Sequence, residues 1–261
     1  MPEFPPRCPP IVPPAWLNVL VPPGHGQAFD VPTPDLGDGA VVGVRTWSPP
    51  GVTDGQPLPL LVVHDGPEYD LRAALTRYLA AGVAGAWLPP LRAALLAPGH
   101  RDQWYSAHPA YARTLARVVL PAVTGRLAST ARIGMGASLG ALAMLHAHVR
   151  HPGTFGALFL QSGSYFTLQY DRMEEGFRYF RRIVRFVAAA PPARAGTRPV
   201  PAVLTCGTSE ENLPNNQLMA QALADAGYPA ELHEVRGGHD WPTWRDSLDP
   251  YLTGLLRRTA G

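Results

Sequence analysis

From residue 40 onward, the pattern of apolar and polar positions alternates between two periods. Short runs rich in Val, Leu, Ile and Ala, with turn-forming residues at both ends, predict β-strands. Longer segments with apolar side chains three or four positions apart, as at Leu71, Leu75 and Leu79, predict helices. The predicted strands cover residues 41–47, 58–64, 91–97, 132–136, 155–161, 200–206 and 230–235, and the predicted helices cover residues 70–81, 109–127, 139–150, 173–187, 213–226 and 244–256. Strands that alternate with helices are typical of one α/β domain with a mostly parallel sheet covered on both faces.

The first 34 residues differ from the rest of the chain in their proline content. They hold 11 of the 30 prolines, and proline fits neither a helix interior nor a central strand. We therefore expect residues 1–34 to form an extended segment wrapped on the surface, with one edge strand over residues 16–21. The domain itself is expected to cover residues 35–261, because no repeat or second boundary interrupts the alternation.

The composition narrows the class of protein. Of 261 residues, 46% are hydrophobic and 16% are charged, which is ordinary for a globular protein. A net charge of +2 gives no electrostatic reason to expect binding to nucleic acid or to an anionic membrane. No apolar run is long enough for a membrane span and the N-terminus lacks an apolar signal region, so we expect a soluble, cytoplasmic protein. The two cysteines, Cys8 and Cys206, predict neither a disulfide scaffold nor a metal site.

The strongest motif is Gly136-Ala137-Ser138-Leu139-Gly140. It follows a predicted strand and precedes an amphipathic helix, the context in which Gly-x-Ser-x-Gly forms a nucleophile elbow. A sharp strand-to-helix turn strains the serine backbone, and the neighbouring glycines remove side chains that would clash. The hydroxyl then lies at a helix N-terminus, whose N–H groups face developing negative charge. We predict Ser138 as nucleophile and the Leu139 N–H as first oxyanion donor, against the simpler interpretation of a plain Gly/Ser turn.

A serine hydroxyl needs a neighbouring base that takes its proton. In α/β-hydrolases the nucleophile, the acid and the histidine follow one another along the chain in that order, and the histidine lies on a loop after the last strand. Here residues 230–235 form the last predicted strand, and Gly237, Gly238 and His239 follow it. His239 is therefore the predicted base. His64 ends a neighbouring strand, so we keep it as a candidate for substrate binding or for a contact behind the site.

The acid is expected in the loop after the strand at residues 200–206. A carboxylate there accepts the second imidazole N–H, which fixes the tautomer and stabilises the imidazolium. Glu210 and Glu211 both lie in this loop. Either side chain could instead cap the helix that follows Asn212. We prefer Glu210 and keep Glu211 in reserve, because Asp240 is too close to His239 in sequence to reach around to its ring.

Several segments together resemble the enterochelin-esterase and esterase-D-like branch of the α/β-hydrolases. They follow one another in the order of that family and extend over roughly residues 40–257. The matching segments are Leu61-Val-Val-His-Asp-Gly66, Arg101 to Tyr105 with Val119-Leu-Pro121, Gly134-Met-Gly-Ala-Ser-Leu-Gly140, His151-Pro152 with Phe155-Gly156 and Gln161-Ser-Gly-Ser164, Gly207-Thr-Ser-Glu210, and Gly237-Gly-His-Asp-Trp-Pro-Thr-Trp244.

The resemblance implies a single-domain α/β-hydrolase fold and hydrolysis of carboxylic esters without a metal or an organic cofactor. It also favours Glu210 as the acid, and it makes Arg101 a candidate for substrate binding. The family pattern places a second oxyanion donor directly after Asp-Gly, where this chain has Pro67 without an N–H. Gly66 or Glu68 would then have to donate, and losing one such donor costs about 10²–10³ in rate.

Residues 165–199 form an insertion rich in aromatic residues and arginine, which in this fold lies beside the nucleophile as a lid-like segment. Tyr165, at its start, is a candidate for substrate binding. Four arginines recur at helical spacing within it: Arg178, Arg181, Arg182 and Arg185. They would attract an anionic substrate, but a solvated helix face is the simpler and favoured interpretation.

The sequence as a whole predicts a serine esterase that acts on a small-molecule ester, of siderophore or aryl type, through an acyl-enzyme at Ser138. One alternative is an acyltransferase that uses the same three side chains with an alcohol as acceptor. A second alternative is a binding protein with the hydrolase fold and no catalysis, which the proline at position 67 favours. The sequence does not determine the oligomeric state.

Overall fold

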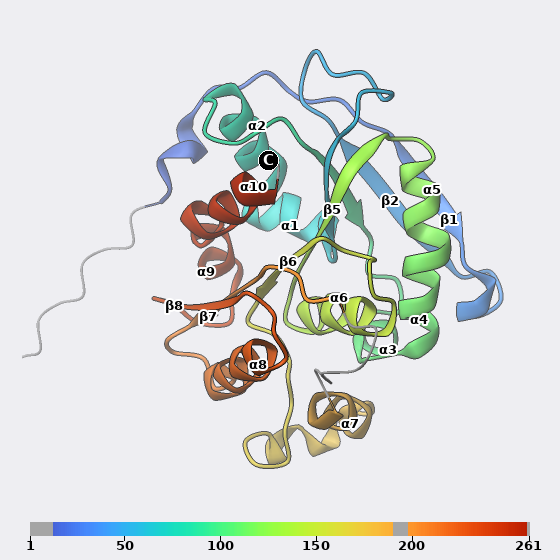
Figure 1. Ribbon diagram of the computed structural model, residues 1–261, viewed down its shortest axis with the longest axis vertical. Coiled ribbons are helices and arrows are strands. Elements are labelled where there is room, and N and C mark those ends of the chain that lie inside the picture. Colours follow the sequence, from blue (N-terminus) through green and yellow to red (C-terminus); the bar gives the residue numbers. More distant parts are fainter. Residues whose placement is uncertain (1–12, 190–197, 260–261) are drawn as a thin grey trace, which may run out of the picture.

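The computed structural model describes residues 13–189 and 198–259. In this part of the chain, eight strands form one sheet in the order β1-β2-β4-β3-β5-β6-β7-β8 (Figure 1). They are β1 (Ala28–Pro32), β2 (Val41–Trp47), β3 (Leu58–Val63), β4 (Arg92–Leu96), β5 (Ser129–Ala137), β6 (Ala157–Gln161), β7 (Ala202–Gly207) and β8 (Ala230–Val235). Strand β2 pairs antiparallel with both β1 and β4, whereas all other pairs are parallel. The predicted mostly parallel sheet is confirmed.

Apolar side chains cover both faces of the sheet. Leu60 and Val62 of β3 join the hydrophobic core on one face, and Leu61 and Val63 join the core on the other. All four side chains are fully buried, and burying one such side chain contributes about 1.5–3 kcal/mol. The helices divide between the two faces (Figure 1). The core that contains Leu60 packs against α3 (Arg101–Tyr105), α4 (Pro109–Thr114), α5 (Leu120–Thr124), α6 (Leu139–Arg150), α7 (Phe180–Ala189) and α8 (Leu213–Asp225). The core that contains Leu61 packs against α1 (Gly66–Ala73), α2 (Leu75–Ala84), α9 (Trp241–Asp246) and α10 (Thr253–Thr259).

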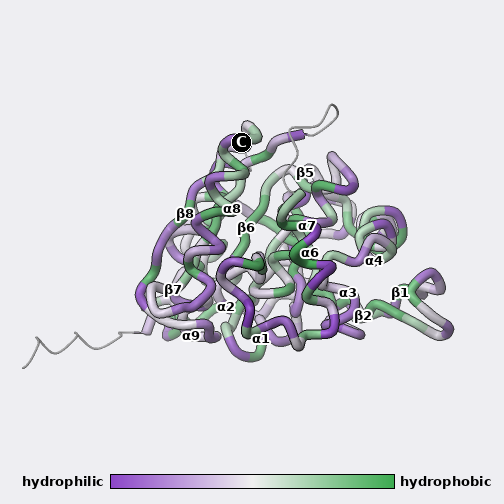
Figure 2. The backbone as a smooth tube through the Cα atoms, turned by 90° about the horizontal axis from the view of Figure 1, so that it is seen from below, coloured by the Kyte–Doolittle hydropathy of each residue, from purple (hydrophilic) through white to green (hydrophobic). Residues whose placement is uncertain are grey.

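The hydropathy along the backbone follows this layered arrangement. Figure 2 shows hydrophobic residues along β6 and α6, in the middle of the molecule, and hydrophilic residues along many of the outer turns. Ten of the twelve residues of α6 are buried, including His146 and His148. No helix within residues 13–189 and 198–259 combines the length and the apolar character that a membrane crossing requires.

The N-terminal segment differs from its prediction. Residues 16–21 do not form an edge strand, because Ala15–Asn18 make a short 3₁₀-helix that buries Trp16 against Tyr78 of α2, with ring centroids 5.4 Å apart. The edge strand is instead β1, which pairs with β2 and ends at Pro32. An edge position tolerates a proline because its missing N–H faces away from the sheet. Residues 1–12 and Cys8 lie outside the described residues.

Four long helices of the prediction are interrupted, and the short helix α3 was not predicted. The helix at residues 70–81 divides at Ala74, whose backbone is left-handed with φ of 51°. The helix at residues 109–127 contains a π-helical turn at Leu115–Val119, between α4 and α5. The other differences are a 3₁₀ turn at Arg172–Gly176 before α7, a π-helical segment at Leu248–Leu252 between α9 and α10, and the unpredicted α3.

The parallel strands end together, and this brings distant loops to one edge of the sheet. Ala137 at the end of β5 lies opposite Gln161 at the end of β6. Gly207 at the end of β7 lies opposite Val235 at the end of β8. The loops that follow these four strands therefore meet at the carboxyl edge, where ligands bind in open α/β sheets.

Candidate active site

Ser138 occupies the turn between β5 and α6 with a backbone that non-glycine residues rarely adopt. Its φ is 56° and its ψ is −125°, and its N–H donates to the carbonyl of Gln161 at 2.9 Å. A Cβ at Gly136 would lie 2.5 Å from the carbonyl carbon of Gly140, and a Cβ at Gly140 would lie 3.1 Å from the carboxylate of Asp65. The two glycines thus leave the room that this turn needs, and the surrounding contacts hold the strained serine.

The first turn of α6 provides the free backbone N–H groups near Ser138. Leu139 is the first residue of this helix, and the first N–H groups of a helix have no acceptor within it. The positive end of the helix dipole adds to their attraction for negative charge. Gly66 and Glu68 lie in the first turn of α1, after the neighbouring strand β3. Neither is among the described residues that line the cavity of Ser138.

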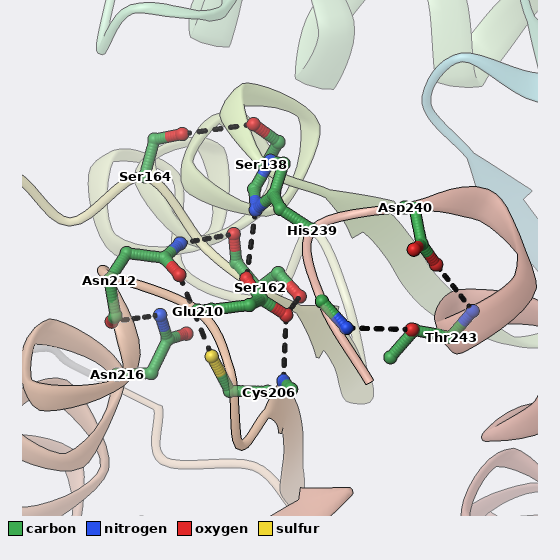
Figure 3. Close-up of polar contacts among 12 residues, drawn as sticks. Ser138, Ser162, Ser164, Cys206, Glu210, Asn212, Asn216, His239, Asp240 and Thr243 are labelled. Carbon is green, nitrogen blue, oxygen red and sulfur yellow. Dashed lines mark hydrogen bonds and ion pairs between the residues drawn. The ribbon is translucent and has the colours of Figure 1, made fainter. Parts of the chain in front are cut away.

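Glu210 lies in the loop after β7, and three donors hold its carboxylate. Oε1 accepts hydrogen bonds from the Ser162 hydroxyl at 2.6 Å and from the Gly207 N–H at 2.7 Å, while Oε2 is 2.8 Å from Nδ1 of His239 (Figure 3). Burial raises the pKa of Glu210, but the hydrogen bonds from His239, Ser162 and Gly207 outweigh it and hold that pKa below its ordinary value. The side chain is therefore a buried, ionised hydrogen-bond acceptor. Glu211, by contrast, is exposed.

His239 lies on the loop between β8 and α9, and the loop's own contacts fix its path. Gly237 has φ of 143°, and a Cβ there would lie 2.1 Å from the hydroxyl of Thr243. Asp240 caps α9 by accepting from the Thr243 N–H at 2.9 Å, so its carboxylate is occupied away from the imidazole. Because the Glu210 carboxylate can only accept, Nδ1 of His239 carries the proton and Nε2 is left as an acceptor. The Trp244 ring packs edge-on against the imidazole, with centroids 5.1 Å apart.

Ser138, Glu210 and His239 line one cavity of about 370 Å³. The Ser138 hydroxyl lies 3.1 Å from the hydroxyl of Ser164 (Figure 3). No hydrogen bond between Ser138 and His239 is present among residues 13–189 and 198–259. The His239 side chain is 42% exposed and lines this cavity.

The loop after β6 supports the site, although the sequence interpretation gave it no role. Ser162 has φ of 48° and bridges the site, since its hydroxyl accepts from the Trp244 indole at 2.9 Å and donates to Glu210. Two amides of the α8 segment hold Ser162 and the next residue. Asn212 donates to the Ser162 carbonyl, and Asn216 both accepts from and donates to the Gly163 backbone. The sequence signal was Ser-Gly-Ser directly after a buried strand parallel to β5.

The predicted binding residues lie away from the cavity of Ser138. His64 is fully buried behind the elbow, with Nδ1 3.0 Å from the Gly140 carbonyl and Nε2 2.8 Å from the Tyr111 hydroxyl. Burial lowers the pKa of His64 to about 3, so the ring is neutral. Tyr165 is also fully buried. Of the two alternatives for His64, the geometry matches the contact behind the site.

Arg101 binds a carboxylate of the protein itself. Its Nε and one terminal nitrogen each lie 2.9 Å from an oxygen of Asp65. The guanidinium also lines a separate cavity of about 590 Å³, whose walls come from α3 and from Gly176 to Tyr179. This second cavity, called here the Arg101 cavity, shares no lining residue with the cavity of Ser138.

Residues 165–189 of the insertion form walls of both cavities. Phe166, Tyr170 and Met173 line the cavity of Ser138, and Arg178 lines the Arg101 cavity. Arg178, Arg181 and Arg185 are exposed, whereas Arg182 donates to carbonyls of the α3 segment and lies over the Tyr179 ring. Residues 190–197 of the insertion lie outside the described residues.

The described residues hold no cluster of metal-binding side chains. Across residues 13–189 and 198–259, no three or more His, Cys, Asp or Glu side chains converge as a metal site would require. Cys206, next to Glu210 in the fold, is buried and unpaired in the described chain, and burial raises the pKa of its thiol above the usual range. A thiol of this kind stays protonated and does not ligate.

The arrangement defines a class of protein: an α/β-hydrolase fold that carries a serine, a histidine and a glutamate at the carboxyl edge of its sheet. The family with the description "Putative esterase" matches residues 39–255, so the chain belongs to this esterase family. No curated protein matches the sequence. The resemblance and the fold class expected from the sequence are both confirmed.

Solved structures share the fold. The enterobactin esterase of Shigella flexneri, in the presence of 2,3-di-hydroxy-N-benzoyl-glycine, superposes with a TM-score of 0.76 at 22% identity over 96% of this chain and 64% of its own. A ferulic acid esterase gives a TM-score of 0.74 at 16% identity over 92% of this chain and 99% of its own. The fluorophosphonate-binding serine hydrolase FphF of Staphylococcus aureus gives a TM-score of 0.64 at 16% identity, over 92% of this chain and 100% of its own. The chain thus spans under two thirds of the enterobactin esterase's length.

Proposed function

We propose that this protein hydrolyses a small-molecule carboxylic ester through a covalent acyl-enzyme at Ser138. The proposal rests on one observation: Ser138, in its strained turn at the start of α6, lines the same cavity as His239, whose Nδ1 is 2.8 Å from Glu210. A nucleophile, a base oriented by a carboxylate and free helix N–H groups are the parts that acyl transfer requires. Membership of the esterase family supports the same reaction.

The reaction begins when the Ser138 hydroxyl turns from Ser164 toward the acceptor nitrogen of His239. Nε2 takes the proton as Oγ attacks the ester carbonyl carbon, and the carbonyl oxygen becomes an oxyanion that the Leu139 N–H stabilises. The carbon–oxygen bond to the alcohol then breaks, and His239 gives its proton to the leaving alcohol. Water attacks the acyl carbon in a second step, with His239 again as base, and releases the acid and free Ser138.

Glu210 acts in this proposal by orienting His239. Its hydrogen bond keeps the proton on Nδ1, and its negative charge stabilises the imidazolium that forms in each step. The contacts from Ser162 and from the Gly207 backbone fix the carboxylate, so little reorganisation is needed during the reaction.

Hydrolysis of p-nitrophenyl acetate tests the proposal. We expect a burst of p-nitrophenol and an acetylated peptide that contains Ser138. Ser138→Ala should lower kcat by about 10⁶, while Ser129→Ala, at the opposite end of β5, should keep the wild-type rate. Added alcohols in the same assay separate hydrolysis from acyl transfer to an acceptor. Wild-type protein that gives neither burst nor acetyl-serine would leave a binding protein with the hydrolase fold as the better account.

A further inference from the structure

The cavity of Ser138 is negatively charged. Four carboxylates line it, Asp171, Glu174, Glu210 and Glu211, and no arginine lies among its described lining residues. Among these four carboxylates, and within the described residues, Glu210 alone contacts a histidine, His239. Asp171, Glu174 and Glu211 form no ion pair within the described chain. The negative charge is therefore not balanced by the protein around the cavity.

Asp171 shows this imbalance most clearly. Its residue exposure is only 6%, and its carboxylate accepts from both the Thr167 N–H, at 2.7 Å, and the Asn215 amide, at 2.8 and 2.9 Å. These partners all donate, which suits an ionised carboxylate, and all are neutral. A buried charge without a counter-ion is costly unless a ligand supplies one. The asparagine orientation is fixed by the same contacts, since its nitrogen must face the two oxygens.

Aromatic and sulfur-containing side chains complete the wall. Phe166 and Tyr170 lie in the same lining as the carboxylates, together with the exposed Met173. The face of an aromatic ring attracts a cation, above all a quaternary ammonium group with a low cost of desolvation. Carboxylates beside aromatic rings thus favour a positively charged ligand group over a negative one.

The arginines of the insertion do not reverse this charge. Arg178 lines the Arg101 cavity, and Arg182 is held against α3. Arg172 is the nearest arginine along the chain to Asp171, and it is exposed and outside the lining of the cavity. A positive surface on the insertion and a negative cavity beside Ser138 therefore coexist.

From this lining we propose that the site selects esters whose acyl or alcohol part carries a positive charge, and discriminates against anionic esters. This inference rests on the proposed function, since Ser138 must be the nucleophile. The cationic group lies against Asp171, Glu174 and Glu211, with the aromatic rings over it, while the ester carbonyl lies at Ser138. Solvent screens the charges of the exposed Glu174 and Glu211. Each of them therefore contributes only about threefold to the preference for the cationic ester.

Two thioesters of nearly equal shape test the preference: acetylthiocholine, which is cationic, and S-(3,3-dimethylbutyl) thioacetate, its neutral isostere. With either substrate the acetyl carbon bonds to the Ser138 oxygen, the carbon–sulfur bond breaks, and the serine proton passes through His239 to the departing thiol. Thiol release gives kcat/KM for both. We expect the cationic substrate to be preferred at least about tenfold at low ionic strength, and less at about 1 M salt, where the screening length falls to about 3 Å.

Charge-neutralising variants locate the cause. Glu174→Gln and Glu211→Gln should each lower the ratio of the two kcat/KM values about threefold, and the double variant about tenfold. Glu175→Gln is the matched control, because Glu175 is exposed on the same 3₁₀ turn but does not line the cavity. Its ratio should equal that of the wild type. These side chains are exposed, so the variants fold.

The outcomes separate this inference from the proposed function. A wild type that hydrolyses both thioesters at equal rates, or prefers the neutral one, overturns the charge preference and leaves the serine esterase standing. A preference that is unchanged in the double variant also overturns it, because the carboxylates are then not its source. A wild-type protein that hydrolyses none of the three substrates, neither of the thioesters nor p-nitrophenyl acetate, overturns both proposals together.

Discussion

The carboxyl edge of the parallel strands and the insertion at residues 165–189 border the same cavity, but they hold their residues differently. At the edge, a Cβ at Gly136 would lie 2.5 Å from backbone, and the Glu210 side chain is fully buried among its donors. In the insertion, Met173 is 67% exposed and a Cβ at Gly176 would meet nothing within 4 Å. The three side chains of the proposed mechanism thus lie on the tightly packed edge, whereas part of the cavity wall lies on the more exposed insertion.

The two cavities beside the insertion extend this comparison. The cavity of Ser138 is lined by carboxylates, of which Glu174 and Glu211 are exposed, whereas Arg101 in the wall of the Arg101 cavity is bound to Asp65. The insertion separates a negative cavity from a more positive one. Under the proposed function, we therefore expect substitutions in the insertion to change substrate preference without disturbing the strand ends that carry Ser138, Glu210 and His239.

Among variants that keep the proposed nucleophile, the largest effect should come from Glu210 at the strand edge. Glu210→Gln removes the negative charge opposite His239 and should lower kcat about 10⁴, because the imidazolium loses its partner and the imidazole tautomer is no longer fixed. Glu234→Gln is the control, because it replaces an exposed carboxylate of β8 with a carboxamide, and it should keep the wild-type kcat. Steady-state hydrolysis of p-nitrophenyl acetate measures both. A loss below about tenfold for Glu210→Gln would remove this residue from the proposed mechanism.

A pair of glycine substitutions tests the difference in packing directly. Gly136→Ala places a methyl group against the Gly140 backbone and should lower the free energy of unfolding by about 1–3 kcal/mol. Gly176→Ala in the insertion meets open space and should change it by less than about 0.5 kcal/mol. Urea denaturation of the two variants gives the comparison. Equal losses would mean that the edge is no more tightly packed than the insertion.

A more gradual effect is the pH dependence of stability, to which the buried His64 behind the elbow and the buried His146 of α6 both contribute. His64 is neutral when folded, with its pKa lowered to about 3 by burial, but the unfolded chain protonates this histidine below about pH 6.5. The unfolded state therefore binds more protons between about pH 6.5 and 3, and stability falls there by about 1 kcal/mol per pH unit as the pH is lowered. His64→Gln should make this slope less steep by the share that His64 contributes, in denaturation measured across the window, while the buried His146 keeps its own share. Parallel curves for variant and wild type would show that His64 does not titrate on unfolding.

The elements that the sequence predicts well are those specified by local pattern. Buried strands such as β3 and β7 consist of continuous apolar runs, and the elbow motif brings its own strand, turn and helix. Parallel strand ends meet by topology, so the proximity of Ser138, Glu210 and His239 follows once the strands are assigned. The preference for Glu210 over Glu211 agrees with the contact to His239, although the catalytic roles stay predictions.

The features that the sequence could not provide depend on contacts between distant segments. Ala74 interrupts a continuous helical pattern, because packing overrides a residue of high helix propensity. The binding role expected of Arg101 has no support from its ion pair with Asp65, which no local pattern reveals. The negative cavity likewise arises only when Asp171 and Glu174 of the insertion meet Glu211 of another loop.

The most direct test of the central claim is labelling with a fluorophosphonate probe, followed by mapping of the modified peptide. The cavity holds three serines, Ser138, Ser164 and Ser209, and only an activated one reacts quickly. The account predicts a single label at Ser138 that is absent in Ser138→Ala and strongly slowed in His239→Ala. A label on Ser164 or Ser209, or an unlabelled wild-type protein, would contradict it.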